Sequence, residues 1–561
     1  MEPKVTARPS SEFRVLIRDV AIVGLCAGTA DFLAVYWGSK LFLSGGVWFG
    51  LWVGIVGCSV LGLLCVLSVI HRFASPQRWI LVGLSVALVA WFGERTMRDA
   101  PPFTDGSVAQ VTPLGAEAVS SATPGTPNVL VVSVDTLRND HVGGDLTRTP
   151  HLDELAANGV RIEAAYAPIA VTGPSHAAML TGAGPWTTGM LLNGVPIPDG
   201  FESLATALGA TGRRTAAFVS AVVLDPVLGF DRGFEVYDHA TGFLPGFELS
   251  TPGRIAAMAV RRADPHGVLE RRGDATTDQA IRWLETVGEE PFFAWVHLFD
   301  PHGPYAPPPP HDTAHYTGDP RSTEHRSMEE VSGVADYLLP SLEGIRDVDW
   351  VRAQYAGEVD FVDEQVGRLI KTLKTSGRLD DTLVVFVGDH GESLGENGVW
   401  FNHGGDLDES ALRVPMIFHW PAGLPNGTVV PPLASVTDVS PTVRGLLGMD
   451  TAAADGVNVF GEAARPGVLA VCYDRGVNQR ERAAGRIERP THVMGRVWGT
   501  SGWLERATHE SRQPRLVGEM PKEDEVRLDR AMAAIGGSVH RGNQNRGADT
   551  VERLKALGYV E

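Results

Sequence analysis

The chain has 561 residues, of which 67 are acidic and 48 are basic, and its formal net charge is −19. This length is ample for more than one domain with a sizeable apolar core. The acidic balance argues against a general nucleic-acid binder, and three of the four cysteines lie in apolar N-terminal segments, which leaves neither a disulfide scaffold nor a Cys-rich zinc site.

Three apolar segments in the N-terminal part predict membrane spans. Residues 47–70 form an uncharged run, which is long enough to cross a hydrocarbon core of about 30 Å at about 1.5 Å per residue. Residues 20–43 form a second segment with two charges, and residues 79–93 form a third that is shorter than the usual length of about 20 residues. Residues 1–93 are therefore predicted to be an α-helical transmembrane anchor of about three helices.

Basic residues predict the orientation of this anchor. Four precede the first segment and two separate the second from the third: Lys4, Arg8, Arg14, Arg18, Arg72 and Arg78. Because Lys and Arg collect on the cytoplasmic side, three crossings place everything after residue 93 outside. We expect a multi-pass protein of the cell membrane whose large C-terminal part is extracytoplasmic.

The remaining chain divides by composition and periodicity. Residues 94–127 are rich in Pro, Gly, Ser, Thr and Ala, which predicts a flexible linker. From residue 128 onward, apolar β-branched runs alternate with helical patterns. The runs lie at 129–134, 215–219, 292–296 and 383–387, and the helical patterns at 149–159, 202–208, 276–286, 351–374 and 438–447. This alternation predicts an α/β sandwich around a mostly parallel sheet over residues 128–450.

Two further segments are less regular. Residues 451–561 are predicted to be a small C-terminal subdomain with a closing helix at 550–557. Residues 312–348 are polar and irregular, and we expect an insertion that borders the functional site.

Two of the predicted strands end in acidic residues. The first runs into Asp135, and the run at 383–387 leads through Gly388 into Asp389 and His390. Either Asp taken alone also fits a helix cap or a turn. Because ligands collect at the carboxyl ends of strands in open α/β sheets, the pair and the His together favour a divalent-metal site.

A third motif begins at Thr172, where a Thr-Gly-Pro-Ser-His turn precedes a helix of small residues. Such a turn can place a hydroxyl at the positive end of a helix dipole. Beside a metal, that hydroxyl becomes a nucleophile for phosphorus or sulfur. Taken alone, the motif is better interpreted as a plain N-cap, for which Thr and Ser are common.

Together these motifs resemble the sulfatase family of the alkaline phosphatase superfamily. The residues that carry the resemblance are Asp135-Thr136-Leu137-Arg138, Thr172-Gly173-Pro174-Ser175-His176, Gly388-Asp389-His390-Gly391-Glu392 and Leu412-Arg413-Val414-Pro415. The resemblance implies an alkaline-phosphatase-like α/β sandwich and a divalent metal held by Asp135, Asp389, His390 and Thr172. It also implies a covalent intermediate on Thr172.

The same resemblance suggests roles for further side chains. We expect Ser175, His176 and Arg138 to bind the substrate, and for Arg138 an anchoring role in the Asp135 loop is equally open. His302 and His403 would be leaving-group acid and oxyanion donor, or would hold a second metal. His297, inside an apolar run, is interpreted as a core residue.

Departures from the family pattern leave the ester open. Thr172 stands where sulfatases of the formylglycine type have Cys, and His176 where they have Arg, so formylglycine cannot form. Thr136 replaces the second acid, and no Lys-x-His sulfate-binding pair is evident. A Thr nucleophile is similar to phosphodiesterase, lipoteichoic-acid synthase and phosphoethanolamine transferase branches, and residues 389–398 resemble the last of these.

Three functions compete at this point. The leading hypothesis is a membrane-anchored, metal-dependent hydrolase of a sulfuric or phosphoric ester in a glycan or lipid, with zinc or manganese favoured over calcium and magnesium. The alternative is a transferase of phosphoethanolamine or phosphoglycerol type that modifies a lipid or surface glycan. The third is a catalytically degenerate glycan-binding domain.

Overall fold

The computed structural model describes residues 127–239, 270–335, 338–430, 433–451, 453–461, 467–474, 478, 492–499, 501–509 and 513–542. These residues belong to one compact unit. The three predicted membrane spans, most of the predicted linker and the predicted helix at 550–557 lie outside the described residues. Within the described ranges, no helix combines the length and the apolar character that a bilayer crossing requires.

The centre of the unit is an eight-stranded sheet. Its strands, in spatial order, are β12 (Thr428–Val430), β2 (Val160–Ile162), β11 (Met416–His419), β7 (Thr382–Gly388), β1 (Asn128–Val134), β6 (Phe292–Leu298), β4 (Arg214–Val219) and β5 (Val236–Asp238). The strands from β7 to β5 are parallel, as the sequence predicts. β11 is antiparallel to both β7 and β2, so the sheet is mixed. The chain between β7 and β11 contains short strands, a 3-10 turn and the four-residue helix α11 (Glu409–Leu412), and it holds no long helix of the kind that usually carries a parallel crossover.

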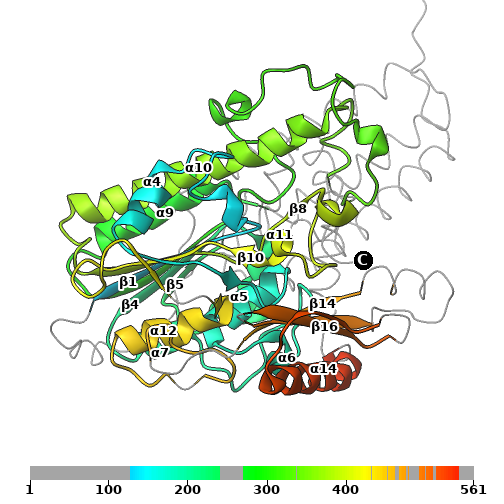
Figure 1. Ribbon diagram of the computed structural model, residues 1–561. Helices are drawn as coiled ribbons and strands as arrows, with labels where there is room; N and C mark the ends of the chain where they lie inside the picture. Colours follow the sequence, from blue (N-terminus) through cyan, green and yellow to red (C-terminus); the bar gives the residue numbers. More distant parts are fainter. Residues whose placement is uncertain are drawn as a thin grey trace, which may run out of the picture. The chain divides into compact units, whose positions relative to one another are not determined.

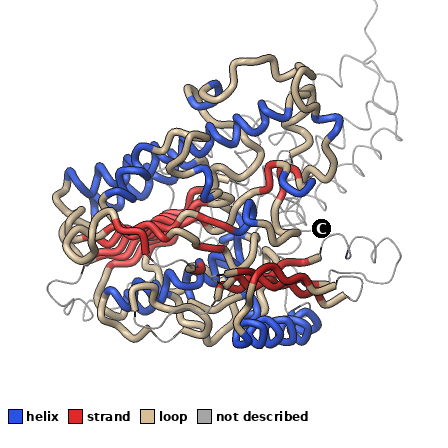
Figure 2. Tube along the Cα trace, in the orientation of Figure 1, coloured by secondary structure: helices blue, strands red, loops and turns tan. Residues whose placement is uncertain are grey.

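Helices cover both faces of this sheet (Figure 1). α4 (Pro150–Ala157), α9 (Gly273–Thr286) and α10 (Val348–Thr375) lie on one face, and α5 (Thr172–Thr181), α7 (Leu204–Gly209) and α12 (Val439–Leu446) lie on the other. Figure 2 shows the same helix–sheet–helix layering. The alternation of runs and helical patterns in the sequence is confirmed.

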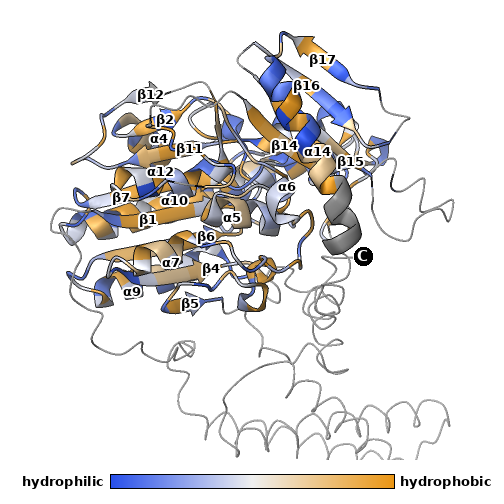
Figure 3. Ribbon diagram, turned by 90° about the horizontal axis from the view of Figure 1, so that it is seen from below, coloured by the Kyte–Doolittle hydropathy of each residue, from blue (hydrophilic) through white to orange (hydrophobic). Residues whose placement is uncertain are grey.

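The central strands are buried on both sides. Every residue of β6 and β7 is buried, and the central strands are largely hydrophobic in Figure 3. Such strands read as continuous apolar runs because neither face meets water. A polar residue inside one of them therefore needs a specific partner.

Smaller elements surround the carboxyl end of the sheet. They are β3 (Ala165–Tyr166), β10 (Arg413–Val414) and β13 (Ala434–Ser435) in one small sheet, the pair β8 (Ser393–Leu394) and β9 (Trp400–Asn402), and the helix α6 (Pro185–Thr188). The 3-10 turns are η1 (Asn139–His141), η2 (Val222–Leu224), η3 (Pro226–Leu228), η5 (His311–Thr313), η6 (Met328–Glu330), η7 (Glu396–Gly398) and η8 (Val436–Asp438).

The C-terminal part forms an antiparallel sheet. Its strands are β14 (Val468–Tyr473), β15 (Val493–Trp498), β16 (Gly502–Ala507) and β17 (Arg515–Gly518), and it packs against α14 (Lys522–Gly542). Leu469 and Leu528 share an apolar cluster with Ile169 of the preceding part. Tyr166 stacks on Trp498 with 4.8 Å between ring centroids. The C-terminal sheet thus shares buried contacts with the α/β part.

Candidate active site

The register of the central strands brings two carboxylates together. Val134 of β1 pairs with Gly388 of β7, so Asp135 and Asp389 leave the sheet side by side. The Asp389 amide donates to the Val134 carbonyl at 3.0 Å, which continues the ladder by one residue. The predicted meeting of Asp135, Asp389 and His390 at this edge is what the structure shows.

The three side chains offer ligand atoms that lie within 4.8 Å of one another. His390 Nε2 is 3.6 Å from Asp135 Oδ1 and 3.5 Å from Asp389 Oδ2. All three side chains are fully buried, and His390 Nε2 and Asp389 Oδ2 have no hydrogen-bond partner. Buried polar atoms without partners are costly, and a bound cation would satisfy them. The donor set therefore fits a divalent metal.

The tautomer of His390 fits the same role. Its Nδ1 lies 2.9 Å from the Gly391 carbonyl, which can only accept, so Nδ1 carries the proton. Nε2 then presents its lone pair to the cluster, as a metal-ligating imidazole does. Burial, followed by the neighbouring His403, lowers the pKa of His390 to about 3, so the ring is neutral at physiological pH.

The surroundings of the Asp389 carboxylate disfavour its charged form. Burial and then the charge of Asp135 raise the pKa of Asp389 well above its usual range. The Asp389 Oδ1 atom accepts from the amides of Thr136 and His390 at 3.2 Å and 2.6 Å, which leaves Oδ2 facing the cluster. A divalent cation would compensate the two adjacent negative charges.

Thr172 lies at the same place. It is the first residue of α5 and is nearly buried, with 2% of its surface exposed. Its Oγ1 is 3.5 Å from Asp135 Oδ1. The next amide, of Gly173, donates to Asn193 Oδ1 at 2.8 Å, which fixes the turn. The hydroxyl therefore sits at the positive end of a ten-residue helix, beside the three ligand atoms.

His302 and His403 complete this side of the site. The His403 ring centroid is 4.7 Å from that of His390 and 5.1 Å from that of His302. His403 Nδ1 lies 3.3 Å from Glu392 Oε1, and Tyr305 donates its hydroxyl hydrogen to Glu392 Oε2 at 3.2 Å. Two histidines and a buried carboxylate therefore adjoin the Asp135–Asp389–His390 cluster.

Comparison with known proteins identifies the family. Residues 127–449 match the family described as Sulfatase. This chain belongs to the sulfatase family. A sulfatase of Formosa agariphila is 27% identical over 358 residues, which cover 58% of this chain and 69% of that protein. A multifunctional alkaline phosphatase superfamily protein of Trinickia caryophylli is 25% identical over 392 residues, with 58% and 74% covered.

Solved structures show the same fold. A phosphonate monoester hydrolase from Silicibacter pomeroyi has a TM-score of 0.54 at 21% identity, covering 76% of this chain and 97% of its own. The architecture is thus alkaline-phosphatase-like with a mixed sheet. Family membership makes the chain an ester hydrolase, and metal dependence is a property of sulfatase-family homologues that the Asp135 cluster matches.

In this sulfatase fold, Ser175 and His176 form hydrogen bonds with the backbone of Asp389 and Thr172. The Ser175 hydroxyl donates to the Asp389 carbonyl at 2.7 Å. His176 Nδ1 lies 2.8 Å from the Thr172 carbonyl and Nε2 lies 2.9 Å from Ser133 Oγ. Both side chains are fully buried, so the expected contact with substrate is replaced by contacts that position Thr172 and Asp389.

The protonation of this network follows from its acceptors. The Thr172 carbonyl can only accept, so His176 carries its proton on Nδ1. The Ser133 hydroxyl then donates to His176 Nε2 and accepts from Trp295 Nε1 at 2.9 Å. Burial, and then the neighbouring His297, hold the pKa of His176 well below its ordinary value. The sulfatase-type Arg is thus replaced by a neutral His with both nitrogens engaged.

Arg138 takes the anchoring role. Its guanidinium lies 2.6 Å from Asp140 and 2.8 Å from Glu396, and it donates to the Glu392 carbonyl at 3.1 Å. Burial alone would lower its pKa, but the hydrogen bond and charge of Asp140 raise it. Arg138 therefore ties the Asp135 loop to the Glu392 loop.

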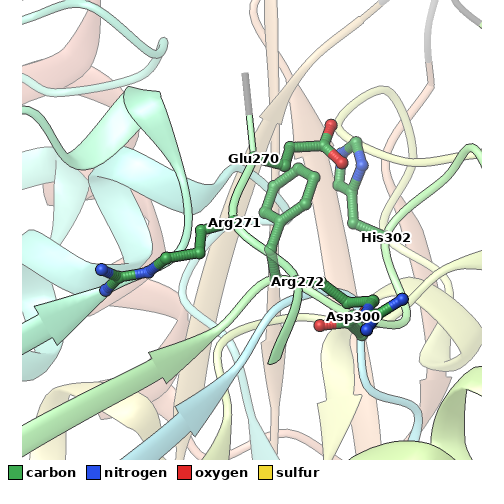
Figure 4. Close-up of a pocket in the computed structure, with 6 residues that line it drawn as sticks. Glu270, Arg271, Arg272, Asp300 and His302 are labelled. Atoms are coloured by element: carbon green, nitrogen blue, oxygen red, sulfur yellow. The ribbon is translucent and has the colours of Figure 1, made fainter. Parts of the chain in front are cut away.

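A narrow pocket lies next to His302, which forms part of its lining (Figure 4). It is lined by Glu270, Arg271, Arg272, Phe299, Asp300 and His302. In Figure 4 the Glu270 carboxylate lies on the His302 side, whereas Arg271 points away and pairs with Asp238. Asp300 Oδ2 accepts from the Gly273 amide at 2.8 Å.

Three features of the sulfatase site escaped the sequence reasoning. Glu392 belongs to a quoted motif but received no role, although an acid two residues after His390 is visible in the sequence. Ser133 is a single serine in an apolar strand, and the sequence gives no sign that it has a role. Thr136 adopts a φ of 52°, which is strained for a β-branched residue and which nothing in its sequence context indicates.

Proposed function

We propose that this chain is a membrane-anchored, metal-dependent hydrolase that cleaves a phosphoric ester through a covalent intermediate on Thr172. The carrying observation is the position of Thr172 Oγ1, at the start of α5 and 3.5 Å from Asp135 Oδ1. A hydroxyl at a helix N-terminus beside a divalent-cation site is suited to nucleophilic displacement at phosphorus. The substrate would be a phosphorylated glycan or lipid.

Phosphorus is favoured over sulfur by the fate of the intermediate. A formylglycine hydrate expels sulfate by re-forming its aldehyde, and a threonyl ester has no such route. Water can instead attack a threonyl phosphate at phosphorus. The neutral His176 in place of Arg, and its engagement with Ser133 and Thr172, also remove one cation from a sulfate pocket. A sulfuric ester is the competing substrate.

The metal would be held by Asp135, Asp389 and His390, and mixed carboxylate and imidazole ligands suit zinc or manganese. When bound, the cation would supply Lewis-acid polarisation of the ester and favour ionisation of the Thr172 hydroxyl. The protein's own part is to hold that hydroxyl in line with the ester.

The proton balance uses the histidines. As the Thr172 oxygen bonds to phosphorus, its hydroxyl proton is released to solvent and the bond from phosphorus to the leaving oxygen breaks. His403 protonates that leaving oxygen, because the Glu392 carboxylate beside Nδ1 stabilises its imidazolium form. Water then attacks phosphorus and gives one proton to the neutral His403, which restores the acid. The bond from phosphorus to the Thr172 oxygen breaks, and that oxygen takes up a proton from solvent.

His302 is the weaker acid candidate. Its Nδ1 donates to the Gly303 carbonyl at 2.7 Å, and burial lowers its pKa to about 4. The ring is therefore neutral near pH 7, with the lone pair on Nε2. We assign His302 a contact with the ester or leaving group.

Residues 1–93 would anchor the enzyme and give it access to bilayer or cell-surface substrates. This part of the proposal rests on the predicted apolar spans and on the distribution of Lys and Arg around them.

The test is an assay of purified full-length protein on an aryl sulfate, an aryl phosphate monoester and an aryl phosphate diester. We expect turnover of a phosphate ester, and Thr172→Ala should reduce it by at least about 10³-fold. The matched control is Thr181→Ala at the other end of α5, whose hydroxyl donates to the Ala177 carbonyl. Faster turnover of the sulfate, or activity that survives Thr172→Ala, would overturn the proposal.

Intact-mass analysis separates hydrolysis from transfer. When the reaction with an aryl phosphate is quenched rapidly, the wild type should carry an added phosphoryl group that Thr172→Ala lacks. A lipid headgroup on Thr172 after exposure to phospholipid, with no turnover of aryl esters, would point instead to the transferase.

A further inference from the structure

His297 lies in the interior of the sheet, beneath the active site. It is a residue of β6, fully buried, and it pairs in the parallel register with Ser133 of β1. Neither ring nitrogen has a hydrogen-bond partner. Its ring meets that of His176 edge-on at 4.8 Å. A core histidine is normally satisfied, so this one requires an explanation.

The two oxygens of Asp135 face different groups. Oδ1 is 3.5 Å from Thr172 Oγ1 and 3.6 Å from His390 Nε2, which places it toward the proposed metal. Oδ2 has no hydrogen-bond partner and lies 3.7 Å from His297 Nε2. Two orphaned polar atoms of complementary character therefore face each other, on the side of the carboxylate away from Thr172 and His390.

We propose that His297 is a positioning residue, which donates from Nε2 to Asp135 Oδ2 and so fixes the rotation of the carboxylate that presents Oδ1 to the metal. The inference rests on the metal site of the proposed function. The separation is slightly longer than a hydrogen bond, and hydrogen bonds in active sites are often long outside the loaded complex. Groups that orient a metal ligand in this way tune its affinity.

The rival interpretation is a packing histidine that only fills the core. Under that interpretation, removal of the ring would lower stability and leave metal binding unchanged. Under ours, His297→Phe keeps most of the volume but leaves Asp135 Oδ2 without its donor, so metal binding changes as well as stability. Its metal affinity should fall by about 10- to 100-fold.

The experiment measures the dissociation constant for Zn²⁺ by chelator competition, and the melting temperature with and without Zn²⁺, in full-length protein. Wild type, His297→Phe and His297→Gln are compared. The Gln amide can donate from a position close to that of Nε2, so affinity should largely return in His297→Gln. In His297→Phe, kcat should fall at low Zn²⁺ with little change in KM, and excess Zn²⁺ should restore it.

The matched control is His419→Phe. His419 is also a buried strand histidine whose pKa is lowered by burial, but it pairs with Val384 near the opposite end of β7. We expect it to leave the Zn²⁺ affinity unchanged. Equal Zn²⁺ affinity in wild type, His297→Phe and His297→Gln would overturn the inference.

The two proposals fail separately. Zn²⁺ affinity is measured without substrate, so a Thr172→Ala enzyme that still turns over would defeat the proposed nucleophile and leave the role of His297 standing.

Discussion

Among the residues that the structure describes, two clusters each bring one histidine and two aspartates close together. One is the cluster of Asp135, Asp389 and His390, and the other consists of His325, Asp347 and Asp349, before and at the start of α10. In each, three ligand atoms lie within 4.8 Å of one another. By composition and distance alone, both would be candidate metal sites.

Their hydrogen bonds distinguish them. Asp347 accepts from the Asp349 amide at 2.9 Å and from the Tyr316 hydroxyl at 2.7 Å, and His325 Nδ1 lies 2.9 Å away. His325 is 57% exposed. In the active-site cluster the carboxylates and the imidazole are buried, with atoms that lack partners. Unsatisfied buried donors and acceptors therefore favour the Asp135 cluster as the candidate metal site. In the His325 cluster the hydrogen bonds are saturated, and Asp347 caps α10 and ties a loop to it.

The largest expected effect follows from Asp389→Asn. Asn keeps the Oδ1 acceptor for Thr136 and His390 and replaces only the oxygen that faces the cluster. We expect Zn²⁺ affinity to fall by more than about 100-fold and turnover to be lost. Because burial and Asp135 raise the pKa of Asp389, the metal-free variant should melt no lower than the wild type. Chelator titration and calorimetry check this, and a retained Zn²⁺-induced rise in melting temperature would contradict it.

A smaller effect is expected for Ser133→Ala. It leaves His176 Nε2 and Trp295 Nε1 without their buried partner, at a cost of about 1–3 kcal/mol. Because His176 holds the Thr172 carbonyl, kcat should fall roughly 10-fold while Zn²⁺ affinity is kept.

The control for this variant is Ser203→Ala, which removes the N-cap of α7 and should cost about 1 kcal/mol without altering kcat. An unchanged kcat in Ser133→Ala would show that the network does not position Thr172.

Asp347→Ala tests the saturated cluster. Loss of the cap of α10 and of the bonds to Tyr316 and His325 should lower the free energy of unfolding by about 1–2 kcal/mol, as measured by urea titration. Zn²⁺ content should not change. A loss of bound metal in this variant would mean that the two clusters are not distinguished as we argue.

The smallest effect concerns pH. The hydrogen bond with Asp347, and then its charge, raise the pKa of His325 above the ordinary value of 6.5. A raised folded-state pKa means that this stabilisation is complete below pH 6.5 and is lost as the pH rises through the folded value. His325→Gln should therefore melt below the wild type at pH 5.5 and converge with it at pH 9. A difference that grows toward high pH would contradict the assignment.

The sequence predicted much of the active-site cluster because its determinants are local. An apolar run that ends in Asp135, another that ends in Asp389 and His390, and a turn that opens a helix at Thr172 each specify their own element. The carboxyl ends of adjacent parallel strands then meet at one edge. Strand direction is not local, and the antiparallel β11 was accordingly missed.

The supporting residues depend on register, which a single sequence does not display. His297 looks like any histidine in an apolar run until Ser133 is placed opposite it. Arg138 pairs with Glu396, which lies 258 positions further along the chain. Because the sequence does not display this contact, the anchoring role of Arg138 could not be separated from anion binding. The membrane anchor and its orientation stay predictions.

Thr136 has a consequence for the rest of the molecule. Its backbone, held at a positive φ, donates to Asp389 and accepts the hydroxyl hydrogen of Tyr355 from α10 at 2.7 Å. The Tyr355 hydroxyl thus couples a 28-residue helix to the proposed metal ligand Asp389. A displacement of α10 at Tyr355 would therefore also move the Thr136 amide that donates to the Asp389 carboxylate.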